Sequence, residues 1–409
     1  MARRSVDHLL IGGGLASAHC ARWLREEGAD GSILLVGREP DPPYSRPPLS
    51  KGYLQGSKSR EDALFRPDEW WEEQQIELLT RTSVMKLDTA ERVAKLSTKE
   101  ELQFDKALLA TGANVNRLRV PGCDLEGLHY LRAFGNSDGI RGAAESGQRA
   151  VIIGGSYIGT EVAASLTAAH GVDCTIVMQE EVTLDRFYGK EVGGYFQSVL
   201  QDHGVELRGS QELDRFEGSD GRVRKVVTKS GLELDCDMVV AGVGVQPDVM
   251  LARSAGLELG EAGGVKCSAL LETSAPGIFA AGDMCEYDSP VHGRHMRIEH
   301  WDVAFNQGKT AALNMLGREQ PHDVVPYFFS DLADWTGMEY VGPGSGDLVV
   351  RGSMEQGEFT AFYLDDGRVT AALTVGRSDD LDHARRFIKG RTAPDSAALA
   401  DVDTDLASL

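Results

Sequence analysis

The stretch from Val6 to Ser17 constrains the fold more than any other part of the sequence. It reads VDHLLIGGGLAS, an apolar run short enough for one buried strand, then glycines, then the start of a helical pattern. A strand, tight turn and helix in this order point the first N–H groups of the helix at the turn. Gly12 permits the turn and Gly14 lets the backbone approach an anion, so a pyrophosphate is the expected occupant.

A second stretch, residues 150–161, repeats the same order with the sequence AVIIGGSYIGTE. One such motif alone is also compatible with an ordinary turn, but its recurrence predicts two dinucleotide sites. The 409 residues leave room for two such units and a smaller one, at about 100–200 residues per domain. The predicted fold class is α/β, with two Rossmann-like dinucleotide-binding domains and a C-terminal α+β domain.

Apolar strands set the expected domain boundaries. The strand ending in LLATGA at residues 108–113 leaves the first domain, and the strand GIFAAGD at 277–283 returns to it. The sequence therefore predicts a first dinucleotide-binding domain at 1–114 and 246–322 and a second one at 115–245. A C-terminal domain is expected at 323–391. The tail, residues 392–409, is small, acidic and without a cation, and we expect it to be disordered.

Charge and cysteine usage exclude several classes of function. The formal charge of −21 argues against nucleic acid and anionic membrane surfaces, and it favours a basic or neutral partner. No apolar run approaches the roughly 18 residues of a membrane helix, and no signal peptide is recognisable, so a cytoplasmic protein is expected. The six cysteines are scattered without metal or redox spacing, which predicts buried free thiols and no metal site.

The residues after the second strand of each unit indicate which ribose each would hold. Glu39 is the candidate for an adenosine ribose in the first unit, with Arg38 a rival for the same edge. In the second unit residues 179–181 are Gln-Glu-Glu, three acceptors where a 2′-phosphate would need a cation. This favours NADH over NADPH, although Arg186 lies close enough in sequence to reach the same edge.

Two further features carry charge to places where a cofactor is expected. Residues 42–51, PPYSRPPLSK, are too proline-rich for a helix and predict a rigid loop, whose cations Arg46 and Lys51 either are surface charges or face a cofactor. Asp283 ends a buried strand and needs partners there. A polyhydroxyl ribityl chain would satisfy it, as would a cap on the following turn.

Taken together, these motifs resemble the two-dinucleotide flavoprotein reductases of glutathione-reductase-like fold. The resemblance is to the ferredoxin reductase branch that serves oxygenase systems, with features of the apoptosis-inducing-factor-like branch. It covers residues 5–390 and rests on both glycine motifs and on PYSRPPLSK, LLATGA, GVGVQP, IFAAGD and RIEHW. It implies FAD in the first domain, a nicotinamide cofactor in the second, and a C-terminal module that closes over the flavin.

The resemblance also implies the residues of both sites. The implied FAD contacts are Gly12, Gly14, Ala16, Ser17, Arg38, Glu39, Arg46, Lys51, Ala110, Thr111, Gly112, Arg132, Asp283, Glu299, His300 and Trp301. The implied NAD contacts are Gly154, Gly155, Ser156, Ile158, Gly159, Gln179, Glu180 and Gly244. Ser156 replaces a glycine of the second fingerprint, which lowers the expected nicotinamide affinity.

Four residues are the implied catalytic set: Lys51, Glu161, Tyr157 and Trp301. Lys51 and Glu161 are expected to pair near the flavin N5, and Tyr157 to lie over the ring where nicotinamide enters. The alternatives are a surface lysine and a first-turn helix glutamate that stabilises the positive dipole end.

The implied reaction is hydride transfer from NADH to FAD and single-electron release to an iron–sulfur protein of ferredoxin or Rieske type. With no paired cysteine, electrons must leave from the flavin edge. Two alternatives stay open: an NADH oxidase or quinone reductase, and an apoptosis-inducing-factor-like, NADH-gated interaction protein, towards which Ser156 and the pair His300–Trp301 lean. A monomer or homodimer is expected.

Overall fold

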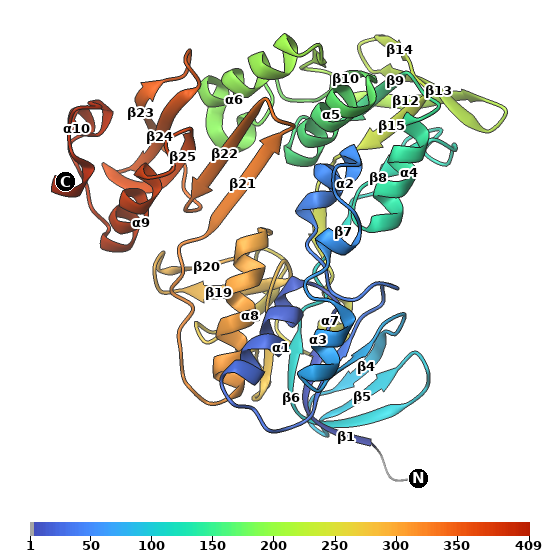
Figure 1. Cartoon of the computed structure of the whole chain (residues 1–409), viewed down its shortest axis with the longest axis vertical. Coiled ribbons are helices and arrows are strands. Elements are labelled where there is room, and N and C mark those ends of the chain that lie inside the picture. The colour runs from blue at the N-terminus through green and yellow to red at the C-terminus, as the bar shows by residue number, and fades with distance from the viewer. Residues whose placement is uncertain (1–3) are drawn as a thin grey trace. The chain divides into compact units, whose positions relative to one another are not determined.

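The computed structural model describes residues 4–409 (Figure 1) and divides the chain into two compact units. The first unit holds residues up to Ser45, Glu61–Asn114 and Gln246–Pro326, and the second holds Arg46–Arg60, Val115–Val245 and Tyr327–Leu409. The loop from Arg46 and the C-terminal segment therefore group with the second nucleotide-binding segment. The boundaries of the three expected domains stay a prediction.

A seven-stranded sheet forms the centre of the first unit. Its order is β3-β2-β1-β6-β5-β4, with β18 paired to β6. The strands are β1 (Arg4–Ile11), β2 (Ile33–Val36), β3 (Ile76–Leu79), β4 (Val84–Asp88), β5 (Val93–Leu96), β6 (Glu101–Leu109) and β18 (Ile278–Ala280). Strands β1, β2, β3, β6 and β18 are parallel neighbours, whereas β4 and β5 form an antiparallel hairpin.

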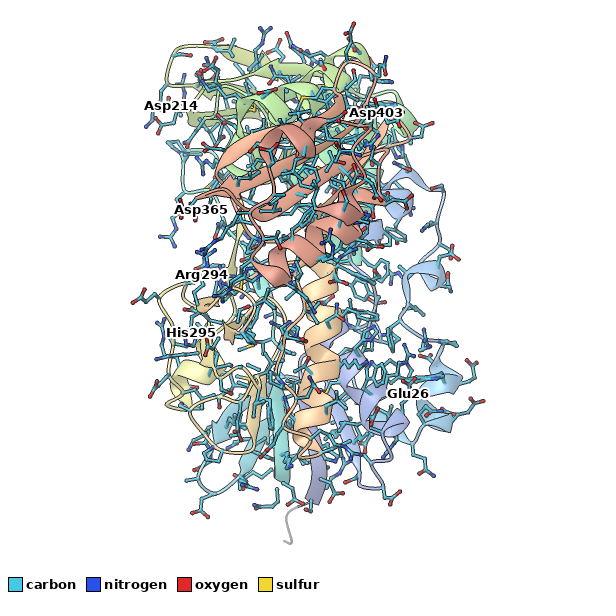
Figure 2. All side chains as sticks on the ribbon, turned by 90° about the vertical axis from the view of Figure 1, so that its left-hand side faces the viewer. Glu26, Asp214, Arg294, His295, Asp365 and Asp403 are labelled. Atoms are coloured by element: carbon cyan, nitrogen blue, oxygen red, sulfur yellow. The ribbon has the colours of Figure 1, made fainter. Side chains whose placement is uncertain are left out.

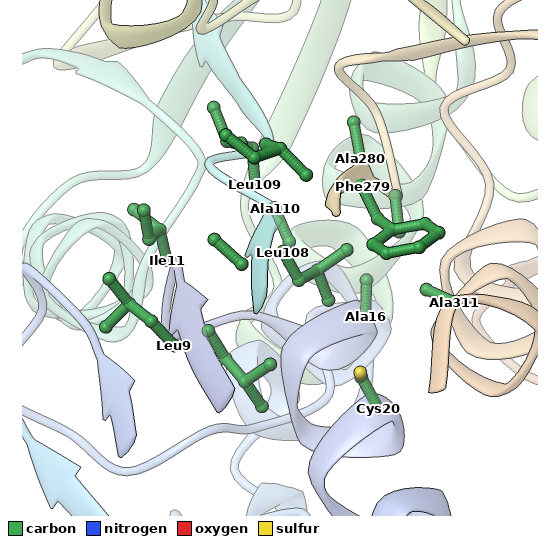
Figure 3. Close-up of a cluster of buried hydrophobic side chains, with 14 of the residues drawn as sticks. Leu9, Ile11, Ala16, Cys20, Leu108, Leu109, Ala110, Phe279, Ala280 and Ala311 are labelled. Atoms are coloured by element: carbon green, nitrogen blue, oxygen red, sulfur yellow. The ribbon is translucent and has the colours of Figure 1, made fainter. Parts of the chain in front are cut away.

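Helices of the first unit bury one face of this sheet. Helix α1 (Leu15–Glu26) packs against α8 (Trp301–Met315), and both meet the sheet in the cluster shown in Figure 3, where Leu9, Ala16 and Ala311 are buried. The remaining elements are η2 (Glu61–Ala63), α3 (Asp68–Glu73), α7 (Met250–Ser254) and the sheet β17 (Val265–Cys267), β19 (Cys285–Ser289) and β20 (Arg294–Met296). The apolar strands at residues 6–11 and 105–109 are thus core strands, as their composition indicated.

The second unit is built on a five-stranded parallel sheet of order β11-β10-β9-β15-β8. Its strands are β8 (Leu128–Tyr130), β9 (Arg149–Ile153), β10 (Asp173–Val177), β11 (Glu206–Arg208) and β15 (Met238–Ala241). Its helices are η1 (Pro47–Ser50), α2 (Gly52–Gln55), α4 (Phe134–Ala144), α5 (Tyr157–His170) and α6 (Asp185–Asp202). An antiparallel sheet of β12 (Leu213–Ser219), β13 (Arg222–Thr228) and β14 (Glu233–Asp235) accompanies it, and β7 (Ala113–Val115) and β16 (Val245–Pro247) carry the chain between units.

An antiparallel module completes the second unit and confirms the α+β prediction for the C-terminal segment. Its strand order is β21-β22-β25-β24-β23. The elements are β21 (Tyr327–Leu332), β22 (Thr336–Val341), β23 (Asp347–Ser353), β24 (Glu358–Asp365), β25 (Arg368–Val375) and α9 (Asp380–Gly390). Strand β21 packs against α5, so the module meets the helix that follows the second glycine turn.

The tail after residue 391 is ordered, and the prediction of disorder was wrong. It forms α10 (Ser396–Ala400) and η3 (Leu406–Ser408). Leu399 and Leu406 are buried, and Arg351 donates hydrogen bonds to tail carbonyl groups, including that of Thr404 at 3.0 Å. The composition of the tail is low in large hydrophobic residues, so it did not indicate that these two leucines are buried. The residues that cover them lie far away in the sequence.

The cysteine prediction holds for five of the six thiols. Cys20, Cys174, Cys236, Cys267 and Cys285 are free and buried, whereas Cys123 is free but exposed. Among residues 4–409, no three His, Cys, Asp or Glu side chains are grouped so that they could hold a metal ion. Over the same described range, no helix has both the length and the apolar character needed to cross a membrane.

Candidate active site

The first glycine turn connects β1 to α1. Gly12 has φ +126, and a Cβ there would lie 2.0 Å from the carbonyl oxygen of Ala110, so only glycine fits. A Cβ at Gly14 would meet no atom within 4 Å. No side chain caps α1, and its first turn contains no acid. The first N–H groups of α1 thus have no side-chain acceptor, and Gly14 leaves room beside them, which fits a pyrophosphate.

Ala16 and Ser17, also expected at this turn, lie inside α1 and are buried. The hydroxyl group of Ser17 is buried without a hydrogen-bond partner in the protein. A buried hydroxyl in this state is costly. Its position in the first helical turn is consistent with a polar ligand at the glycine turn.

The second turn, between β9 and α5, repeats this geometry. Gly154 has φ +108, and a Cβ there would lie 2.4 Å from the carbonyl oxygen of Gly242. A Cβ at Gly155 would lie 2.2 Å from Sδ of Met178, and one at Gly159 would lie 2.0 Å from the carbonyl oxygen of Gly154. Three glycines thus keep this turn tight against the neighbouring strands and its own helix.

Ser156 does not block the second turn. Its hydroxyl donates to the carbonyl oxygen of Gly242 at 3.3 Å, and it leaves the N-terminus of α5 uncapped. The first turn of α5 contains no acid. The second turn therefore also fits an anion, and the side chain of Ser156 is directed back into the fold.

The residues proposed for the two riboses have identifiable partners. Tyr44 donates to Glu39 through its hydroxyl at 2.5 Å, whereas Arg38 pairs with Asp248 at 3.0 Å and donates to Asn114 at 2.7 Å. Both side chains thus have partners within the protein, and the choice of Glu39 over Arg38 stays a prediction.

The acids after β10 have cations beside them: Arg186, which the sequence analysis named as able to reach this edge, and Lys190, which it did not. Glu180 pairs with Arg186 and Glu181 pairs with Lys190, while Gln179 is exposed. Both cations belong to α6, whose start is held near the glycine turn by a hydrogen bond from the amide of Leu184 to the carbonyl of Gly155. The edge therefore has balanced charges, because α6 begins directly over it.

The small-residue turn after β6 is fixed by backbone and hydroxyl contacts. Ala110 donates its amide to Ile11 at 2.7 Å. Thr111 donates its hydroxyl to the carbonyl of Asp248 at 2.6 Å, and Gly112, with φ +71, accepts from the amide of the same residue at 2.8 Å. The turn at residues 110–112 thus lies beside Gly12. The short distance from a Cβ added at Gly12 to the carbonyl oxygen of Ala110 agrees with this.

Asp283 and Glu299 are brought together by an arginine that the sequence analysis did not single out. Arg297 donates to the carbonyl of Asp283 at 3.0 Å and forms an ion pair with Glu299. Arg297 stands within the RIEHW motif, which was the available signal. Asp283 itself follows β18 in a half-buried position.

His300 and Trp301 form the start of α8. Trp301 donates its indole N–H to the hydroxyl of Ser45 at 2.9 Å and stacks on Phe305 with ring centroids 5.4 Å apart. His300 occupies the N-cap position of the helix. The indole is thereby fixed in one orientation next to the proline-rich loop's first residues.

The predicted ion pair between Lys51 and Glu161 is confirmed. Nζ of Lys51 lies 2.7 Å from Oε1 of Glu161, and the two side chains are 14% and 4% exposed. Ser50 and Ser330 also donate their hydroxyl groups to this carboxylate. Because the pair is buried and Glu161 lies beyond the first turn of α5, the readings as a surface lysine and a helix-terminus glutamate are both wrong.

Tyr157 opens α5 within a group of aromatic rings that the sequence did not reveal. Its hydroxyl bonds that of Tyr188 at 2.8 Å, and its ring contacts Phe187 and Phe328 with centroids 4.6 and 4.4 Å away. Burial raises the pKa of the Tyr157 phenol well above its usual value. The phenol is therefore neutral, and next to it Ile158 is partly exposed.

The remaining expected residues hold loops of the second unit. Arg46 donates to the carbonyl oxygen of Arg132, which links the proline-rich loop to the segment before α4. Gly244 accepts from the amide of Asn116 at 3.0 Å. Both contacts place these residues on the segments that flank the nucleotide-binding sheet.

Two glycine turns that fit a phosphate, each between a parallel strand and a helix, occur together with a lysine–glutamate ion pair. This combination defines a two-dinucleotide oxidoreductase. The chain belongs to the pyridine nucleotide-disulphide oxidoreductase family, whose model matches residues 6–308, and a Reductase C-terminal model matches residues 327–409. The family binds FAD and a nicotinamide dinucleotide, and both glycine turns fit such groups. The predicted resemblance and fold class are confirmed.

Several of the similar proteins are ferredoxin reductases. The probable ferredoxin reductase CtmF of Castellaniella defragrans is 33% identical over 98% of this chain and 98% of its own length. The crystal structure of the ferredoxin reductase for the CYP199A2 system from Rhodopseudomonas palustris has a TM-score of 0.94, with 31% identity over 98% of this chain and 99% of that chain. The crystal structure of the covalent putidaredoxin reductase–putidaredoxin complex has a TM-score of 0.93. Its sequence identity is 31%, and the match covers 100% of this chain and 98% of that chain.

Proposed function

We propose that this oxidoreductase is the reductase component of an oxygenase system, which takes a hydride from NADH and passes electrons singly to an iron–sulfur protein. The observation that carries the proposal is the buried pair of Lys51 and Glu161 in a chain whose cysteines are all free. A buried ammonium suits a reaction in which negative charge develops next to it. The thiols form no disulfide, and the two that approach each other, Cys267 and Cys285, are buried in the core of the first unit. The proposal therefore takes the final acceptor to be a separate molecule.

FAD, when bound, supplies the chemistry of accepting a hydride and releasing electrons one at a time. The β1–α1 turn binds its pyrophosphate, Glu39 accepts from the adenosine ribose, and Asp283 from the ribityl chain. The other FAD contacts implied by the family resemblance keep their roles as parts of this proposal. Lys51 stabilises negative charge on the ring, and Glu161 holds its ammonium group in place.

The nicotinamide cofactor is NADH rather than NADPH. The β9–α5 turn binds its pyrophosphate, and Glu180 accepts from the ribose hydroxyls. A 2′-phosphate would be repelled by Glu180 and would have to compete with it for Arg186, since the two already form an ion pair. Tyr157, neutral and packed among aromatic rings, lies at the helix start where the nicotinamide ring must enter.

The cofactor preference is tested with two glutamate variants. We expect wild-type kcat/KM to be higher for NADH than for NADPH. Glu180→Gln should raise the ratio of kcat/KM for NADPH to kcat/KM for NADH about tenfold, because it removes the repulsive acid and frees Arg186. Glu181→Gln, which removes the exposed partner of Lys190, is the matched control and should change the ratio by less. A wild-type preference for NADPH, or equal effects of both variants, would refute the assignment.

The reaction is tested by anaerobic stopped-flow with the holoenzyme. NADH should bleach the flavin absorbance rapidly, and a [2Fe–2S] ferredoxin should restore it faster than O2 or a quinone does. Lys51→Met and Glu161→Gln should both slow the bleaching and leave FAD bound. Faster recovery with O2 or quinone would favour the oxidase or quinone reductase, and slow bleaching with a persistent long-wavelength band would favour an NADH-gated interaction protein.

The nature of the acceptor rests on the similar proteins. The solved putidaredoxin reductase is bound to putidaredoxin, and this chain matches it over its whole length. The alignment includes the C-terminal module. An iron–sulfur protein of ferredoxin type is therefore the proposed partner of this chain.

A further inference from the structure

The carboxylate of Glu161 is held by three donors from two separate parts of the chain, the adjacent Ser50 and Lys51 and the distant Ser330. Oε1 accepts from Nζ of Lys51 at 2.7 Å and from the hydroxyl of Ser330 at 2.5 Å, and Oε2 accepts from the hydroxyl of Ser50. Glu161, Ser50 and Ser330 are 3%, 2% and 1% exposed. Water therefore has little access to the carboxylate, and these three donors satisfy it.

Ser50 and Lys51 are already fixed to α5 by other contacts. The backbone carbonyl of Ser50 accepts from the hydroxyl of Ser165 at 2.7 Å, and Gln55 donates to the same hydroxyl oxygen at 3.0 Å. Helix α2 packs along α5 through these contacts. The segment that carries Ser50 and Lys51 is thus joined to α5 by contacts that do not involve the C-terminal module.

Ser330 is the contribution of the C-terminal module. It lies on β21, the edge strand of its sheet, in register with Met338 of β22. The residue before it, Phe329, has its ring centroid 5.6 Å from Nζ of Lys51. The strand therefore touches both members of the ion pair, with a hydroxyl on the carboxylate and an aromatic ring near the ammonium.

The geometry at Oε1 decides where the ammonium can lie. A carboxylate oxygen has two lone-pair directions, and Ser330 and Lys51 share those of Oε1. With Ser330 on one lone pair of Oε1, only the other lone pair is left for Lys51. The ammonium group therefore has one favourable position. Without the hydroxyl, both lone pairs of Oε1 are open to Lys51, so the ammonium group has a second position available to it.

We propose that Ser330 is a positioning residue for hydride transfer, which acts by orienting Glu161 so that Lys51 holds its ammonium group at one place. The proposal rests on the proposed function, because the ammonium matters only if a hydride acceptor lies next to it. It assigns to the C-terminal module a part in the first half-reaction as well as in the fold.

Two substitutions of nearly equal shape isolate the hydroxyl group. Ser330→Thr keeps a hydroxyl and suits a β-strand, whereas Ser330→Val removes it. In anaerobic stopped-flow of the holoenzyme, we expect the limiting rate of flavin bleaching by NADH to fall about tenfold in the Val variant and by less than about twofold in the Thr variant. The NADH concentration for half-maximal rate should stay the same, because the glycine turn is untouched.

Thr374→Val is the matched control for loss of a buried hydroxyl in the same module. Thr374 donates to the carbonyl of Phe359 at 3.1 Å and lies 3.2 Å from the hydroxyl of Thr360, so it has no contact with Glu161 among its hydrogen bonds. Its limiting rate should equal that of the wild type. A tenfold loss in this variant would show that general weakening of the module is enough, and it would overturn the proposal.

A second measurement does not depend on catalysis. The rate at which an amine reagent labels Lys51 in the apoprotein, followed by mass spectrometry, should rise in Ser330→Val and Ser330→Ala, stay at the wild-type value in Ser330→Thr, and be highest in Glu161→Gln. Equal labelling and equal bleaching rates in the Val and Thr variants would refute the proposal. If NADH fails to bleach the wild-type flavin, the proposed function falls, whereas the labelling pattern still decides whether Ser330 positions Lys51.

Discussion

At the scale of single residues, two glycines of the first turn are required for different structural reasons. Gly12 is required by the fold itself, because its φ is +126 and a side chain would collide with the backbone of Ala110. Gly14 has an ordinary φ of −95 and open space around its missing side chain. A side chain at Gly14 would therefore disturb only an incoming ligand.

This difference predicts opposite outcomes for two alanine variants. Gly12→Ala should lower the stability of the apoprotein by more than about 2 kcal/mol and lose FAD, because backbone must move. Gly14→Ala should leave the melting temperature of the apoprotein unchanged and weaken FAD binding at least about tenfold, as the methyl group lies where the pyrophosphate approaches. Calorimetry of the apoproteins and FAD titration check this, and full FAD affinity in Gly14→Ala would contradict it.

Two buried histidines of the first unit make stability depend on pH. Burial lowers the pKa of His19, packed between Phe65 and Phe305, to about 3, and lowers that of His322 to about 4. Both rings are therefore neutral in the folded protein at neutral pH. In the unfolded chain they take up a proton near their ordinary value of 6.5.

The sign of the effect follows from proton uptake. Above pH 6.5 these rings are neutral in both the folded and the unfolded state. As pH falls from 6.5 towards 4, the unfolded state binds protons and the folded state does not. The free energy of unfolding therefore decreases over this range. Each ring contributes about 1.4 kcal/mol per pH unit in this window. Denaturant unfolding of wild type and His19→Leu between these pH values should show a shallower slope for the variant, and an unchanged slope would refute the assignment.

At the scale of elements, one buried arginine holds the C-terminal tail. Arg351 on β23 donates to the carbonyl groups of the 399–404 segment and lies 3.6 Å from the carboxylate of Asp380, which starts α9. Arg377 and Thr360 also hold that carboxylate, at 2.9 and 2.8 Å. The sheet, α9 and the tail therefore share one polar centre.

Arg351→Met should release the tail. It removes the guanidinium donors from four tail carbonyl groups and one cation from a buried acid, which together should cost about 3–5 kcal/mol. Amide hydrogen exchange in residues 395–409 should accelerate strongly. Arg386→Gln, which removes a more exposed donor to the carbonyl of Leu406, should have a smaller effect. Equal exchange in both variants would contradict the role given to Arg351.

At the scale of the whole molecule, the acidic balance governs encounters with partners. The chain carries a formal charge of −21. Exposed acids such as Glu26, Asp365 and Asp403, labelled in Figure 2, come from segments far apart in sequence. The long-range field is therefore negative, and it repels an acidic partner at low ionic strength.

Electron transfer should accordingly depend on salt in a way that reveals the partner's charge. The kcat/KM for an acidic [2Fe–2S] ferredoxin should rise as ionic strength goes from about 0.01 to about 0.1 M, because the Debye length shrinks from about 30 to about 10 Å. With a neutral quinone it should stay constant. A fall with the ferredoxin would show that a local cationic surface outweighs the net charge.

From the sequence alone we could predict the two glycine turns, the strands around them and the α+β character of the C-terminal segment. These features depend on residues next to one another: the φ of Gly12 and Gly154, and short apolar runs that must be buried. The pairing of Lys51 with Glu161 was predicted only through the family resemblance, since no spacing rule links residues so far apart. It is nevertheless confirmed by a 2.7 Å contact.

Only the tertiary structure decided the contacts that join distant segments. Ser330 on Glu161, Arg186 on Glu180 and the carbonyl groups bound by Arg351 each depend on which helix or strand packs beside another. A serine in YFFSDL or an acidic tail gives no local signal of its partner. Backbone sterics and hydrophobic period act over a few residues, whereas a side-chain hydrogen bond requires two surfaces to meet within about 3 Å, which only the packed chain specifies.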